Sequence, residues 1–65
     1  MKININNKAT TTGAATLNEL AATLHLPDKG VAIAVNNIMI PRTEWANSSL
    51  RDGDDIVILK AFSGG

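Results

Sequence analysis

Four consecutive apolar residues near the end of the sequence, Ile56-Val57-Ile58-Leu59, constrain the fold more than any other feature. A short run that is apolar on both faces is expected of a strand in the middle of a sheet, because a strand with one face in solvent alternates instead. We therefore predict a central strand over residues 55–62, with other strands on both sides. If Ile56 and Ile58 face the core, Val57 and Leu59 point to the opposite face.

Two hairpins are predicted before this strand, because apolar residues recur at every second position near two asparagine pairs. Asparagine tolerates the positive φ angles of a tight turn, so Asn6-Asn7-Lys8 and Asn36-Asn37 are placed at the turns. The predicted strands cover residues 2–6, 9–12, 31–35 and 38–40.

One main helix is predicted between the hairpins, from about residue 17 to residue 25. Thr16 and Glu19 have the spacing of a capping box, and leucines follow at helical intervals along one stripe. Pro27 ends the helix. Residues 42–50 are predicted to form a loop with a helical turn.

This order of elements is that of the β-grasp, or ubiquitin-like, fold. It is an α+β fold with a mixed sheet of four to five strands and one main helix packed on one face. The last strand lies parallel to the first at the centre of the sheet. We predict a single domain over residues 1–65, with residues 63–65 as a flexible C-terminal tail.

Composition excludes several functions. Six Lys or Arg balance six Asp or Glu without a run of like charges, so a nucleic-acid partner is not expected. No apolar stretch approaches the roughly 20 residues that span a membrane, and the start alternates instead of forming a signal peptide, so we predict a cytoplasmic protein. The sequence has no cysteine, which excludes disulfides, thiolate metal sites and persulfides. We predict no bound metal or cofactor.

Three motifs occur together in the second half of the chain. Pro41 and Arg42 begin a Pro-Arg-x-x-Trp stretch, an Asp-Gly-Asp turn follows at residues 52–54, and the sequence stops at Gly64-Gly65. In this order and spacing they closely resemble the ThiS family, the sulfur carriers of thiamine biosynthesis, over nearly the whole chain. Three positions depart from the family pattern: Asn7 and Asn37 stand where a turn glycine is frequent, and Ser63 where alanine is frequent.

The resemblance implies that the chain is a carrier and co-substrate and has no catalytic residues of its own. The carboxylate of Gly65 would be adenylated by a ThiF-like enzyme with ATP and then converted to a thiocarboxylate by sulfur-relay proteins. The sulfur would pass to a thiazole synthase resembling ThiG. Gly64 would give the tail clearance in a narrow channel, because it has no Cβ. The small subunit of molybdopterin synthase and a ubiquitin-like modifier or binding domain are alternatives, and the sulfur donor stays open.

Three other residues are candidates for partner binding. Val57 and Leu59 form an apolar patch on the uncovered sheet face, which suggests a docking surface. Phe62 is expected to anchor the base of the tail in a partner, or else to fold back on the domain.

The remaining candidates have structural interpretations. His25, the lone histidine, lies near the end of the helix without a catalytic constellation around it. Arg42 is expected to pair with a carboxylate or cap a carbonyl, and Trp45 to cover the edge of the core. The acidic residues Asp52, Asp54 and Asp55 are interpreted as part of a turn, because a calcium loop needs more oxygen ligands at regular spacing.

Overall fold

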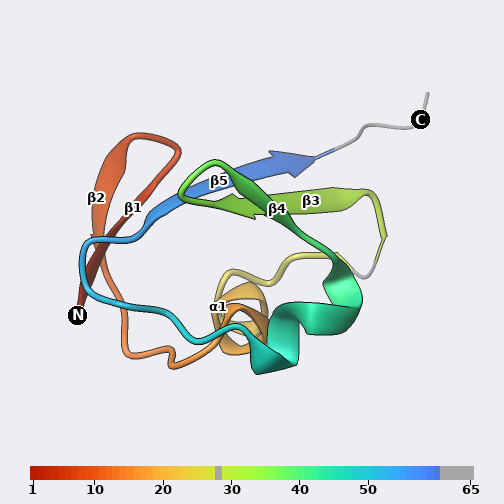
Figure 1. Ribbon diagram of the computed structural model, residues 1–65, viewed down its shortest axis with the longest axis horizontal. Helices are drawn as coiled ribbons and strands as arrows, with labels where there is room; N and C mark the ends of the chain where they lie inside the picture. Colours follow the sequence, from red (N-terminus) through yellow and green to blue (C-terminus); the bar gives the residue numbers. More distant parts are fainter. Residues whose placement is uncertain (28, 61–65) are drawn as a thin grey trace.

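The computed structural model describes residues 1–27 and 29–60. They form a five-stranded sheet with an α-helix and a 3₁₀ helix on one of its faces (Figure 1). The elements in chain order are β1 (Lys2–Ile5), β2 (Lys8–Thr11), α1 (Leu17–Thr23), β3 (Val31–Val35), β4 (Ile38–Ile40), the 3₁₀ helix η1 (Arg42–Asn47) and β5 (Asp55–Lys60).

The predicted topology is confirmed. The strand order is β2-β1-β5-β3-β4, so β5 is the middle strand. It runs parallel to β1 and antiparallel to β3, and the two hairpins are antiparallel. β5 is described as far as Lys60, and the last two residues of the predicted strand, 61 and 62, lie outside the described residues.

Both hairpins turn at their asparagine pairs. The φ angles are +49° and +67° at Asn6 and Asn7, and +50° and +69° at Asn36 and Asn37. Positive φ at both central residues is the geometry of a type I′ turn, whose twist matches that of the flanking strands. Because two residues suffice for the first turn, β2 begins at Lys8, one residue earlier than predicted.

The helix begins as predicted and ends earlier. The Thr16 hydroxyl accepts a hydrogen bond from the Glu19 backbone N–H at 3.2 Å. The prediction that the helix reaches residue 25 was wrong, because the chain turns left-handed at His25 (φ +55°). The His25 N–H donates to Ala22 O and the Leu26 N–H to Ala21 O, the paired bonds of a Schellman motif, so the helix ends before Pro27 exerts any effect.

The hydrophobic core lies between the sheet and the two helices. Its largest fully buried side chains are Ile3, Leu17, Leu20, Ile33, Trp45 and Ile56. Trp45 was predicted at the edge of the core, which was wrong: η1 packs beside α1 and leaves this side chain 1% exposed. Its indole N–H donates to the Ile40 carbonyl oxygen at 2.9 Å, which satisfies the one polar atom of the buried ring.

Candidate functional site: the open sheet face and the end of β5

The side chains of β5 alternate between the two faces of the sheet. Ile56 and Ile58 are buried in the core, whereas Val57 is half-buried and Leu59 is 59% exposed. This confirms the predicted orientation. Both helices of the described chain lie on the core side, so Val57 and Leu59 point to a face that no described helix covers (Figure 1).

The neighbouring strands extend this apolar surface across the sheet. Val57 pairs with Ala34 and Leu59 with Ala32 in β3, and Ala34 in turn pairs with Met39 in β4. Directly paired residues point to the same face, so these five side chains form one apolar strip on the open face. Met39 is 58% exposed and Leu59 59%.

The two alanines and Met39 were missed in the sequence. Alternation with the core residues Ile33 and Ile40 places Ala32, Ala34 and Met39 on the open face. Alternation does not show which of them lies beside Val57, because that depends on the register between strands. The pairing of β3 with both neighbours supplies this register.

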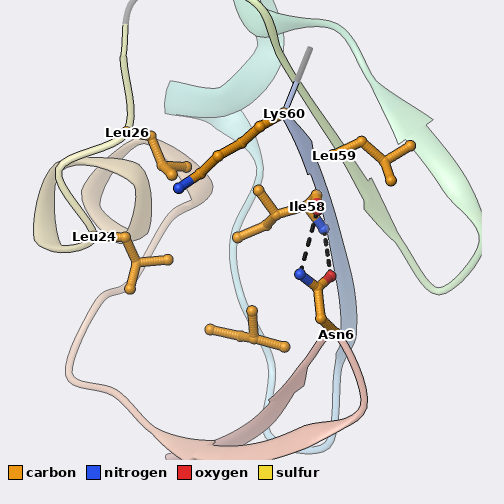
Figure 2. A pocket seen from close by; sticks show the side chains of 7 residues that line it. Asn6, Leu24, Leu26, Ile58, Leu59 and Lys60 are labelled. Carbon is orange, nitrogen blue, oxygen red and sulfur yellow. Dashed lines mark hydrogen bonds between the residues drawn. The ribbon is translucent and has the colours of Figure 1, made fainter. Parts of the chain in front are cut away.

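A groove of about 460 Å³ lies where β5 and α1 end (Figure 2). Leu24 and Leu26 line it on the helix side, and Ile58 and Lys60 on the strand side. The Lys60 side chain extends across toward Leu26, so the aliphatic part of a charged side chain covers apolar surface at this end of the sheet (Figure 2).

The Asn6 side chain clasps β5 at this end. Its amide group donates to the Ile58 carbonyl oxygen at 3.3 Å, and its amide oxygen accepts from the Ile58 N–H at 2.8 Å (Figure 2). β1 stops at Ile5 because the chain turns at Asn6, so the side chain takes over the pairing that the β1 backbone no longer provides.

Asn36, the first residue of the second turn, makes a similar clasp at the other end of β5. Its amide oxygen accepts from the Asp55 N–H at 3.0 Å, and its amide group donates to the Asp54 carboxylate at 3.1 Å. β5 is therefore held near both ends by turn asparagines, in addition to the backbone pairing on its two sides.

The predicted tail residues cannot be placed. Phe62, Ser63, Gly64 and Gly65 lie outside the described residues, so their roles stay predictions.

Two of the other candidates have structural partners. The Arg42 guanidinium donates to the Pro27 carbonyl oxygen at 3.1 Å, which confirms the predicted carbonyl cap, and lies over the Trp45 ring with 4.4 Å to the ring centroid. His25 is exposed at the end of α1.

Asp52 and Asp54 lie at the predicted turn, whereas Asp55 begins β5. The Asp52 carboxylate accepts from the Lys2 N–H at 2.7 Å. Asp54 is buried and accepts from the Arg51 N–H at 2.8 Å. Within residues 1–27 and 29–60 no group of three His, Asp or Glu side chains could hold a metal ion. Neither helix of this part of the chain is long and apolar enough to cross a membrane.

The fold places the chain in the class of small β-grasp proteins, which have the last strand at the centre of the sheet. The ThiS family model matches residues 2–65. The chain is 35% identical over 66 residues to sulfur carrier protein ThiS of Escherichia coli K12, covering 100% of both chains. It resembles the crystal structure of ThiS from Geobacter metallireducens with a TM-score of 0.82 and 26% identity, covering 100% of both chains. The solution structure of a thiamine biosynthesis protein from the same organism gives 0.82 and 25%, covering 100% of this chain and 88% of the other.

The chain therefore belongs to the ThiS family. It is a sulfur carrier protein of thiamine biosynthesis, as the resemblance in its sequence implied. Family membership decides between the alternatives that the sequence left open. A carrier of this kind implies enzyme partners that load and unload it.

Proposed function

We propose that the sulfur is carried on the C-terminal carboxylate of Gly65, which a ThiF-like enzyme adenylates with ATP. The observation that carries this proposal is that the chain has no cysteine, so a thiol group is not available to hold sulfur as a persulfide. The family match supports it, because it extends through Gly65.

The chemistry of a terminal carboxylate explains why two steps are needed. The carboxylate is ionised at neutral pH and resists attack by a sulfur nucleophile. Attack of one carboxylate oxygen on the α-phosphorus of ATP forms an acyl adenylate and releases pyrophosphate. The terminal sulfur of a persulfide on a sulfur-relay protein then attacks the carbonyl carbon and displaces AMP, which forms an acyl disulfide with the relay protein. A second thiol attacks the relay-protein sulfur of this bond, and the S–S bond breaks to release the thiocarboxylate and leave a disulfide between the two thiol groups. The thiocarboxylate donates its sulfur to a ThiG-like thiazole synthase, in the cytoplasm.

The apolar strip is the proposed docking surface for these enzymes. Val57 and Leu59 would bury apolar area against a partner, which is the main driving force of protein association. Phe62 is proposed as an anchor at the base of the tail. The partners would supply the catalytic groups, and the carrier would supply a recognised surface and a carboxylate within reach of it.

The test is ATP–pyrophosphate exchange by the purified adenylating enzyme with carriers altered at Gly65. Deleting Gly65 moves the terminal carboxylate back by roughly 3.3–3.6 Å, whereas a misplacement of 1 Å can already cost about 100-fold in rate. Adding one residue after Gly65 places its carboxylate in an amide. We expect both variants to lose exchange while their unfolding temperatures stay unchanged, because the last residues of a chain generally contribute little to stability.

A matched control is Ser63→Ala, which changes the tail without moving its carboxylate and should retain exchange. Undiminished exchange by the carrier that lacks Gly65 would contradict the proposal. Mass spectrometry of the loaded wild-type carrier gives an independent readout, namely the replacement of one terminal oxygen by sulfur.

A further inference from the structure

The two turn asparagines that clasp β5 differ in their distance from the end of the chain. Asn6 clasps Ile58, which is seven residues before Gly65. Asn36 clasps Asp55, which is ten residues before it. Otherwise the two asparagines are alike. Each is the first residue of its turn, with a φ angle of +49° or +50°. Each also donates its backbone N–H to a carbonyl oxygen of β5, at 2.9 Å in the first turn and 2.8 Å in the second.

The Asn6 clasp holds the part of β5 that β1 does not reach. β1 pairs with β5 as far as Ile5 and Ile56, whereas β3 pairs with β5 as far as Lys60. From Ile58 onward β5 is therefore paired with the backbone of β3 on one side. On the other side the Asn6 side chain bonds to both polar groups of the Ile58 backbone. Without these two bonds the end of β5 would be paired on one side only.

We propose that Asn6 is a positioning residue for the adenylation of Gly65, and that it acts through Ile58 by fixing the end of β5 from which the tail starts. This inference rests on the proposed function, because it concerns the delivery of the same carboxylate. Every residue between a fixed strand and the reacting carboxylate must be ordered before the reaction, and each one costs conformational entropy. A clasp that orders the end of β5 in the free carrier removes part of this cost in advance.

The experiment compares Asn6→Gly with Asn36→Gly in the full chain. Glycine adopts the positive φ angle of both turns without steric cost and keeps the backbone N–H. Each variant therefore loses only the two side-chain hydrogen bonds of one clasp. Rates of ATP–pyrophosphate exchange by the purified adenylating enzyme are measured against carrier concentration, at a temperature at which melting curves show every carrier to be folded.

We expect Asn6→Gly to lower kcat about tenfold with an unchanged KM, and Asn36→Gly to keep both constants. A tenfold loss of rate corresponds to about 1.4 kcal/mol, which is the order of the cost of fixing one more backbone residue. The KM should stay because the folded surface is the same, whereas kcat includes the placement of the carboxylate beside ATP. A merely structural role would lower stability in both variants and leave their kinetic constants alike. Amide hydrogen exchange at Ile58 should be faster in Asn6→Gly than in Asn36→Gly.

Equal kcat values for the two variants would overturn the inference alone. A raised KM with unchanged kcat would do the same, because Asn6 would then be a direct contact of the enzyme. If Asn6→Gly does not fold, Asn6→Asp replaces it, since aspartate also tolerates a positive φ angle and keeps an acceptor for the Ile58 N–H. With one hydrogen bond lost, its kcat should fall about two- to tenfold, and a wild-type kcat would contradict the inference. Failure of the wild-type carrier to support exchange, or undiminished exchange by the carrier that lacks Gly65, would overturn the proposed function and this inference with it.

Discussion

The Asn6 clasp predicts a stability loss that can be separated from the effect of its turn. Replacing Asn6 with glycine keeps the positive φ angle, because glycine adopts it without steric cost, and removes both hydrogen bonds to Ile58. A hydrogen bond of this kind contributes about 0.5–1.5 kcal/mol net, so two contribute about 1–3 kcal/mol. Asn7→Gly is the matched control, because Asn7 has the same kind of backbone angle and its side chain bonds to no other described residue.

We expect Asn6→Gly to lower the free energy of unfolding by about 1–3 kcal/mol more than Asn7→Gly. The entropy that glycine adds to the unfolded chain is similar at both positions and cancels in the difference. For a domain of this size 1 kcal/mol corresponds to about 4–8 °C in unfolding temperature. Urea unfolding measures the difference, and faster amide exchange at Ile58 would locate it. Equal losses in the two variants would refute the reasoning, since the clasp would then contribute nothing beyond the turn.

Three further predictions test the surface, the buried tryptophan and the helix cap. Val57→Asp and Leu59→Asp should weaken binding to the adenylating enzyme by a few kcal/mol, because a carboxylate is then buried in the interface without a partner, while stability changes little at the exposed Leu59. Titration calorimetry measures the binding and a melting curve measures the stability. An equal loss of stability and binding would place both side chains in the core. Trp45→Phe should lower the free energy of unfolding by roughly 1–3 kcal/mol, because the Ile40 carbonyl oxygen loses its donor. Chemical unfolding measures this loss, and an unchanged free energy of unfolding would mean that water replaces the indole N–H. Thr16→Ala should cost about 1 kcal/mol by removing the N-cap of α1, whereas Thr16→Ser should restore most of it in the same assay.

The sequence predicted the sheet face on which a strand residue lies better than it predicted which residues lie side by side on neighbouring strands. Alternation placed Ile58 and Leu59 on opposite faces of the sheet, because side chains in a strand alternate with a period of two. The assumption that Ile58 is the one that faces the core is confirmed by the burial of the two side chains. The row of Met39, Ala34 and Val57 did not follow from alternation, since it depends on the register between strands that are distant in the chain.

Features that rest on one particular contact were also beyond sequence reasoning. The end of α1 was placed two residues too late, because a histidine in the left-handed conformation gives no signal comparable to glycine. The asparagine pairs predicted both turns. The clasps of Asn6 and Asn36 on β5 did not follow, because they require the hairpin tips to lie beside that strand.

The central position of β5 would help so small a protein to direct the proposed Gly65 carboxylate into another enzyme. β5 is paired on both sides and clasped near both ends, so Leu59 is fixed relative to the rest of the sheet. Gly65 lies six residues after Leu59, and at most about 3.3–3.6 Å per residue gives a reach of about 20–22 Å. If a partner holds the apolar strip, the phosphorus that its active site offers to Gly65 must lie within that radius of the docked Leu59. The same upper bound would apply to the proposed thiazole synthase, so two enzymes that share no reaction step would both need an active site within that distance of the docking surface.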